Sequence, residues 1–258
     1  MADVAPGWGL VVAALLGGAV IGLLALWEPM VRGHGIPEAM QAVVRDQSRI
    51  SLRAAVAKPV ATSVAIGTGA PFGAEGPIIV TGGAAGSLLG QALRVSPAER
   101  KILLAAGSAA GMAAIFGTPV GAVLLAIELL LFEFSTRAFV PLVIASVVAD
   151  AVHVRLFGGG PFFPVPGVRS AGAAALPFFA VLGLALGGLG VLISVVVYRV
   201  ESLFEHTPIP RVMRPVIGGL VFAVVGIAVP RVLGPGYDVI GDTLRNRLTL
   251  VRPCATPS

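Results

Sequence analysis

The chain has 258 residues, of which 56% are hydrophobic and 12% charged, and its mean hydropathy is +0.94. Soluble domains carry about 25% charged residues, so this composition excludes an ordinary soluble domain and predicts an integral membrane protein. The net charge of +5 includes two basic clusters, at 45–58 and 94–101, which we expect in loops that anchor the chain at the membrane interface rather than on a face that binds nucleic acid.

Six apolar stretches are spread evenly along the chain, and the continuous ones approach the roughly 20 residues that a bilayer requires. They predict a single multi-pass transmembrane domain over 1–258, in a cell membrane that we take to be a bacterial inner membrane because no signal peptide is recognised. The 34 Gly and 20 Pro predict broken, tilted helices around an internal site, as in transporters. The stretches cover residues 8–27, 59–93, 102–132, 139–157, 176–197 and 216–232.

The first stretch is followed by the motif G-H-G-I-P-E at residues 33–38. Its two glycines permit positive φ and a close approach of a ligand to the backbone. Pro37 and Glu38 are typical of the first turn of a helix, which we expect to continue to Arg45. The alternative is an ordinary turn between two helices.

The second motif, G-T-G-A-P-F-G-A-E-G-P at residues 67–77, places Glu75 inside an apolar sequence. A charge at bilayer depth costs at least ~2.5 kcal/mol on insertion scales and therefore indicates a functional site. Pro77 predicts a helix that begins at that residue, with unpaired N–H groups and a positive dipole end that suit an anion. A glycine-rich packing helix would explain Gly82, Gly83, Gly86 and Gly90, but it does not explain Glu75.

No metal, cofactor or enzymatic site is predicted. The single Cys254 excludes an internal disulfide and a cysteine metal cluster, and the three histidines are scattered. Ser108 and His153 are the one candidate nucleophile–base pair, but they lack a G-x-S-x-G context and an acid placed to orient the histidine.

An internal repeat relates residues 17–35 to residues 218–236, with seven identities in 19 positions at an offset of 201. In both copies an apolar helix ends at a proline and enters a G-x-G turn, a pattern that indicates the binding site of a transporter built from repeats. We expect most of a first repeat over 8–157, the start of a second over 171–245, and an irregular tail over 246–258. The counterpart of Glu75 would lie at position 276, so we expect a truncated protein, incomplete at both ends.

These motifs resemble those of the CLC family of chloride channels and transporters. The run 33–38 is similar to the family's G-S-G-I-P-E, and G-A-E-G-P to its G-R/K-E-G-P. Residues 104–130 look like its paired helices that end in an acidic pair, and G-P-G-Y at 234–237 resembles the second half's counterpart of the first motif. The resemblance covers residues 8–245 and implies an all-α polytopic membrane protein with an inverted repeat of broken, tilted helices.

The resemblance also implies the roles of single residues. Glu75 would be the gate, a carboxylate that occupies the outer anion position and leaves when it is protonated or displaced by chloride. Two backbone segments would bind the anion, one at Gly33, His34, Gly35 and Ile36, the other at Gly73, Ala74, Gly76 and Pro77. His34 stands where the family usually has serine, and an imidazole N–H can also donate.

Leu129 falls at the position of the family's inner proton-relay glutamate, and a leucine cannot carry a proton. The substitution favours channel-like conduction over strict exchange. The alternatives are a Cl⁻/H⁺ antiporter with another proton route and a non-conducting fragment. A cation carrier is less favoured, because a helix N-terminus attracts anions.

Two further implications concern assembly and what is missing. The resemblance implies a homodimer with a separate pore in each subunit, supported by apolar helices such as 139–149, in contact with lipid, chloride and possibly protons. The family's later G-x-F-x-P helix start and coordinating tyrosine would lie beyond Ser258, and Tyr237 belongs to a different motif.

Overall fold

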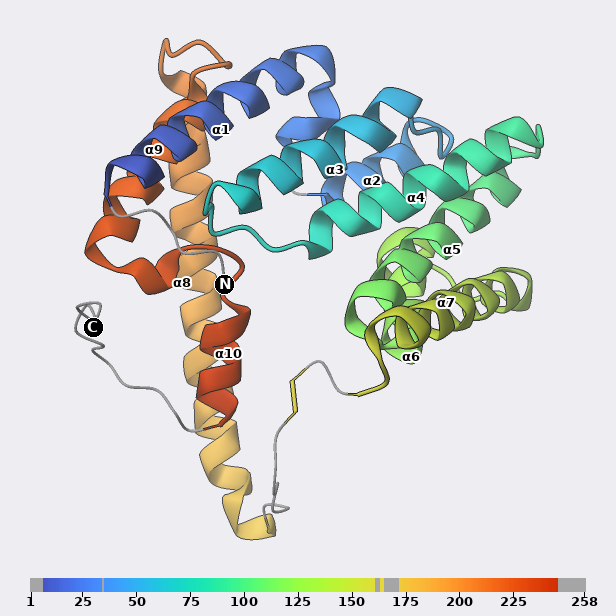
Figure 1. Cartoon of the computed structure of the whole chain (residues 1–258). Coiled ribbons are helices and arrows are strands. Elements are labelled where there is room, and N and C mark those ends of the chain that lie inside the picture. The colour runs from blue at the N-terminus through green and yellow to red at the C-terminus, as the bar shows by residue number, and fades with distance from the viewer. Residues whose placement is uncertain (1–6, 34, 161–162, 165–171, 246–258) are drawn as a thin grey trace.

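The computed structural model describes residues 7–33, 35–160, 163–164 and 172–245, and within these ranges the regular structure is helical, with no strand (Figure 1). The prediction of an all-α fold is confirmed. The α-helices are α1 (Trp8–Trp27), α2 (Ile36–Val44), α3 (Leu52–Gly67), α4 (Glu75–Ala92), α5 (Pro97–Phe116), α6 (Pro119–Ala126), α7 (Thr136–Phe157), α8 (Leu176–His206), α9 (Arg214–Ala228) and α10 (Tyr237–Leu244). Four short segments complete the list: the 3₁₀ turns η1 (Pro29–Arg32), η3 (Ala173–Ala175) and η4 (Pro230–Val232), and the π-helical η2 (Ile127–Leu131).

The expected breaks in the apolar stretches are present. Residues 59–93 divide between α3 and α4, and residues 102–132 between α5, α6 and η2. In the part of the chain that the structure describes, three helical segments are long and apolar enough to cross a membrane: Trp8–Trp27, Thr136–Phe157 and Ala173–His206. The remaining apolar helices are too short for that criterion or less apolar, as expected for a protein with an internal site between broken helices.

Serine residues start three of the helices. Ser51, Ser96 and Ser135 accept a hydrogen bond from the backbone N–H three residues further on, at 3.0, 3.3 and 3.3 Å. Each thereby satisfies one of the N–H groups that a helix start leaves unpaired. The helices α2 and α4 begin differently, because Gly35 and Ala74 have no side chain that can cap them.

Glycines bring α4 and α5 into direct backbone contact. A Cβ added at Gly86 would overlap the carbonyl of Leu103, and Gly82 and Gly107 face one another in the same way. The glycines of α4 therefore do serve packing, which lets two helices approach more closely than larger residues allow. The α7 helix lies along the other side of α5, where Leu142 joins the main apolar core.

The two copies of the repeat have the same order of elements. η1 begins at Pro29 and α2 at Ile36, whereas η4 begins at Pro230 and α10 at Tyr237, again 201 residues later. The helices α1 and α9 pack side by side and antiparallel (Figure 1). Gly22 lies against Val212, Gly18 against Val216 and Ala14 against Gly219. Residue numbers therefore decrease along α1 as they increase along α9, which shows that the two helices are antiparallel.

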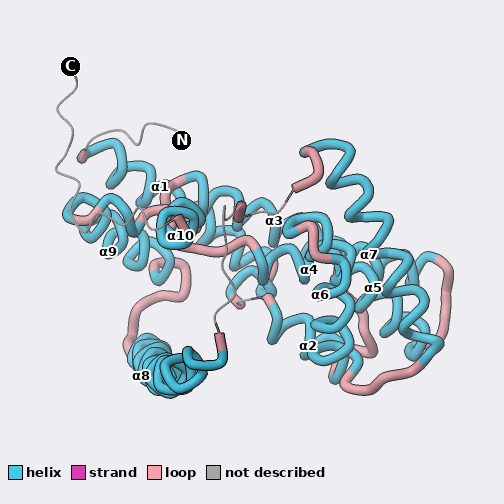
Figure 2. Tube along the Cα trace, turned by 90° about the horizontal axis from the view of Figure 1, so that it is seen from below, coloured by secondary structure: helices cyan, strands magenta, loops and turns pink. Residues whose placement is uncertain are grey.

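α8 stands apart from the other helices, as the view along its axis in Figure 2 shows. None of its residues is buried, and it makes no extensive contact with another described helix. The expected boundary at residue 171 and the expected tail at 246–258 lie outside the described residues.

Candidate functional site

The structure brings the two glycine motifs together. Gly35 is buried with φ of +109°, and a Cβ at this position would overlap the carbonyl group and the Cα of Gly76. Only glycine allows the starts of α2 and α4 to approach so closely at this φ. His34 lies outside the described residues, between two glycines whose positions are known.

The start of α2 carries its own carboxylate. The backbone N–H of Gly35 donates to Glu38 Oε2 at 2.5 Å, and the same carboxylate lies over Gly33, where a Cβ would collide with it. A carboxylate in the first turn compensates the positive end of the helix dipole. The predicted helix start is confirmed, and α2 begins at Ile36, one residue before Pro37.

A buried lysine forms hydrogen bonds with the backbone of the turn that precedes α2. Lys58 on α3 is 3% exposed, and its ammonium donates to the carbonyls of Met30 at 3.1 Å and Val31 at 3.5 Å, and to that of Gly33. The expectation that this lysine belongs to a loop cluster at the membrane interface is wrong. Arg100 of the second cluster is also buried, and its Nε donates to the carbonyl of Gln47 at 2.9 Å.

α4 begins at Glu75, two residues before the predicted start at Pro77. Pro77 occupies the third helical position, where its missing N–H costs no intrahelical bond. The Glu75 carboxylate is exposed and folds back over Gly73, where a Cβ would collide with it. Ala74 has no side chain that could cap the helix, so it pairs none of the first-turn N–H groups of α4. The Glu75 carboxylate belongs to the same first turn.

The second repeat copy reaches the same location. Gly234 donates its N–H to the carbonyl of Gly69 at 3.1 Å, which joins the G-P-G-Y turn to the loop that leads to Glu75. Tyr237, the first residue of α10, follows this turn directly and lies near enough to Glu75 for the two to interact electrostatically. The sequence aligns the G-P-G-Y turn with the first motif, but it does not predict that Tyr237 lies near Glu75.

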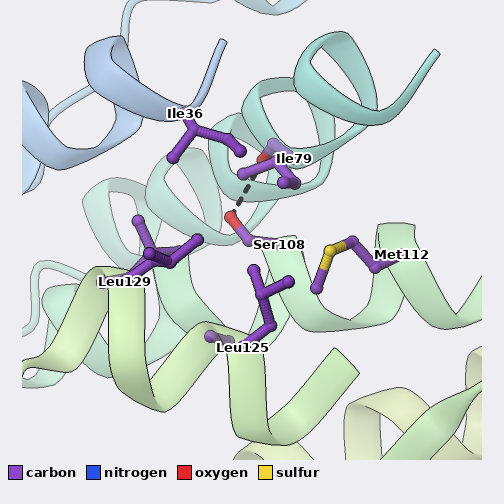
Figure 3. Close-up of a pocket in the computed structure, with 8 residues that line it drawn as sticks. Ile36, Ile79, Ser108, Met112, Leu125 and Leu129 are labelled. Atoms are coloured by element: carbon purple, nitrogen blue, oxygen red, sulfur yellow. Dashed lines mark hydrogen bonds between the residues drawn. The ribbon is translucent and has the colours of Figure 1, made fainter. Parts of the chain in front are cut away.

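Leu129 lies in the π-helical segment η2 and lines an apolar pocket with Ile36 of the first motif (Figure 3). The pocket also includes Ile79, Met112 and Leu125. Its polar member, Ser108, donates to the carbonyl of Ile79 at 2.9 Å and so offers no free hydroxyl. The neighbouring Glu128 is exposed.

The two residues weighed as an enzymatic pair bind different backbone carbonyls. Ser108 donates to Ile79, whereas His153 Nδ1 lies 2.6 Å from the carbonyl oxygen of Ala114. Among the described residues, no group of three or more His, Cys, Asp or Glu side chains is placed to hold a metal ion.

Comparison with known proteins gives a family match over nearly the whole chain. Residues 16–256 match the family model described as voltage gated chloride channel. A putative chloride channel protein ClcB-like from Ralstonia nicotianae is 28% identical over 244 residues, which is 93% of this chain and 57% of that protein. The H(+)/Cl(-) exchange transporter ClcA from Klebsiella pneumoniae is 30% identical over 255 residues, 93% of this chain and 54% of that protein.

Solved structures show the same fold. A slow cyanobacterial Cl⁻/H⁺ antiporter superposes with a TM-score of 0.80 at 23% identity, over 95% of this chain and 59% of that one. A CLC-type fluoride/proton antiporter superposes with a TM-score of 0.72 at 21% identity, over 93% of this chain and 69% of that one. The chain spans little more than half the length of the curated relatives named above.

Proposed function

Because the chain belongs to the voltage-gated chloride channel family, we propose that it forms part of a chloride pathway through the membrane, with Glu75 as the gate. The observation that carries the proposal is the contact of Gly35 with Gly76, which joins the starts of α2 and α4. Two helix N-termini that meet in this way present backbone N–H groups to one location, an arrangement that suits an anion.

In this proposal the Glu75 carboxylate competes with chloride for the N–H groups at the start of α4. The carboxylate lies over Gly73, just before the start of α4, and its negative charge there supports such a competition. Chloride passes when the carboxylate is protonated or swings away. The segments Gly33–Ile36 and Gly73–Pro77 together bind the anion, and no cofactor takes part.

Leu129 supports conduction without strict proton coupling. Its side chain shares an apolar pocket with Ile36, and the one hydroxyl there is bonded to a backbone carbonyl. An apolar lining offers no group that could pass a proton from Glu128 toward the first motif. Antiport through another proton route is the alternative.

The gate is tested by Glu75→Gln in purified protein reconstituted in liposomes, with chloride efflux as the readout. The amide cannot be ionised, so we expect higher efflux at neutral pH and a weaker dependence of efflux on pH. Glu133→Gln is the matched control, because Glu133 is an exposed carboxylate in the loop before α7. Equal efflux and equal pH profiles in parent and Glu75→Gln would show that Glu75 is not the gate.

The proton-relay position is tested by Leu129→Glu with Leu129→Gln as the control. A carboxylate can hold a proton, so we expect the Glu variant to move protons when a chloride gradient is applied, and the Gln variant to move none. Proton movement by the parent chain at the level of the Glu variant would contradict channel-like conduction and support the antiporter alternative.

A second candidate is a non-conducting chain. Absence of chloride efflux from liposomes that contain the purified parent chain would establish it and would refute the pathway proposal for this chain. We further propose that the chain lies in a cell membrane, a bacterial inner membrane by its compactness, and assembles as a homodimer.

A further inference from the structure

A second group of polar side chains lies on α7, at its contact with α5. Ser146, Asp150 and His153 follow one another at spacings of four and three residues, so they share one face of the helix. The helix is otherwise apolar enough to span a membrane. Polar groups on the packed face of such a helix are costly and indicate a function.

One of these side chains is buried, and two of their oxygens lack a hydrogen-bond partner. Ser146 is 0% exposed, whereas Asp150 is half-buried with its Oδ1 shielded from solvent, and neither Ser146 Oγ nor Asp150 Oδ1 has a partner in the structure. Nearly all buried polar atoms in native proteins are paired, and an exception is explained by a bound water or ion or by a functional role. Neither side chain takes part in the proposed anion pathway.

The third residue, His153, has a defined tautomer. Its Nδ1 lies 2.6 Å from the carbonyl oxygen of Ala114, an atom that can only accept, so Nδ1 carries the hydrogen. If the ring is neutral, Nε2 then presents a lone pair. A backbone carbonyl that fixes the ring in this way is the usual second partner of a histidine that binds a metal.

The free acceptors of Asp150 and His153 converge at the turn between α5 and α6. Gly117 has φ of +61°, and a Cβ there would lie 3.6 Å from Asp150 Oδ1 and 3.8 Å from His153 Nε2. A cation or a hydrogen-bond donor placed beside Gly117 would be within reach of both acceptors. α6 carries no charged residue, and the charges of α5 are confined to 99–101, at the end far from Ala114; Arg155 of α7 is exposed.

We propose that Asp150 and His153 bind a divalent transition-metal ion of the Zn²⁺ or Cu²⁺ class at the junction of α5, α6 and α7. A carboxylate and an imidazole together suit these ions, whereas Mg²⁺ and Ca²⁺ prefer oxygen ligands alone. The spacing Asp-x-x-His matches the carboxylate-x-x-histidine pairs that bind metals inside helical bundles. Water fills the remaining positions, with Ser146 one turn away as a partner for it.

The sequence predicts no metal site, because its three histidines are scattered along the chain. The pair becomes visible only when the packed face of α7 and the open turn at Gly117 are known.

The proposal is tested by isothermal titration of Zn²⁺ into the detergent-solubilised full chain, in a Cys254→Ser background that removes the thiol. We expect one ion per chain with a micromolar dissociation constant. Asp150→Asn should weaken binding by about tenfold or more, and His153→Ala should weaken it further. His206→Ala is the matched control and should bind as the parent does, because His206 is exposed at the end of α8.

A second variant keeps the test decisive if His153→Ala fails to fold. His153→Cys should shift the preference from Zn²⁺ toward Cd²⁺, since a thiolate is a softer ligand than an imidazole. Failure of the parent to bind Zn²⁺, or equal binding by the parent, Asp150→Asn and His153→Ala, would overturn the proposal. Both measurements are independent of chloride transport.

Discussion

Lys58 connects α3 to the turn that leads into the first motif. A single ammonium group on α3 donates to the carbonyls of Met30 and Val31 within η1 and to that of Gly33 directly after it. Carbonyls at the end of a short helical turn otherwise lack donors, and burial denies them water. The position of Gly33 in the candidate site therefore depends on a residue 25 positions further along the chain.

Replacing Lys58 by methionine keeps the length of the side chain and removes its donors. We expect the free energy of unfolding to fall by about 1–3 kcal/mol, the cost of leaving buried acceptors unpaired. SDS titration of helicity in mixed micelles, followed by circular dichroism, measures the change. Lys101→Met is the control, because Lys101 is only half-buried and donates to one carbonyl, that of Leu131 at 2.8 Å. An equal or larger loss for Lys101→Met would contradict this role of Lys58.

The sequence indicates the importance of some residues of the candidate site but not of others. Glu75 could be identified because an ionisable group in an apolar stretch is conspicuous in one dimension. Lys58 and Tyr237 could not be identified in that way, because their importance depends on which helix faces them. A lysine beside a polar loop has the same appearance in the sequence whether its ammonium reaches water or buried carbonyls.

Among the elements, α4 and α5 show most clearly how small residues determine packing. The backbone of each helix lies where a side chain of the other would be, at Gly82, Gly86 and Gly107. The glycine spacing predicted close packing of α4 with some helix, and the structure identifies that helix as α5. The sequence could not identify the partner, because small residues also recur in α1, α8 and α9.

Gly107→Ala is expected to lower the free energy of unfolding by about 1–3 kcal/mol, because the added methyl group would collide with the carbonyl of Gly82. Gly187→Ala on α8 is the matched control, since nothing lies within 4 Å of a Cβ at that position. The control should be neutral or stabilising by up to about 1 kcal/mol, the difference in helix propensity between alanine and glycine. The same SDS titration checks both variants, and equal effects would show that the α4–α5 contact is looser than described.

At the scale of the whole molecule, two large apolar surfaces remain exposed. α8 has no buried residue, and only 11% of the apolar window of α7 is buried. Lipid covers such surfaces in a membrane protein, as does another subunit. The order of the elements and the register of the repeat could be predicted from the sequence, whereas the isolation of α8 could not, since its apolar pattern is the same in lipid and in a protein core.

If two copies pair through the outer face of α7, a cysteine at Ile144 should form a disulfide-linked dimer on mild oxidation. Ile144 is 58% exposed in the middle of that face. A cysteine at Leu184 on α8, which is 79% exposed, is the control for random collision. Both variants require the Cys254→Ser background, and non-reducing electrophoresis gives the readout. Dimers from Leu184→Cys alone would assign the interface to α8.

The antiparallel contact of α1 with α9 has a consequence for biosynthesis. Ala14 and Gly219 touch one another, yet more than two hundred residues separate them along the chain. At ribosomal speeds of about 5–20 residues per second, α1 is made roughly 10–40 s before α9. During that interval the face of α1 that carries Gly18 and Gly22 has no native partner, and it is open to nascent chains or chaperones in the same membrane.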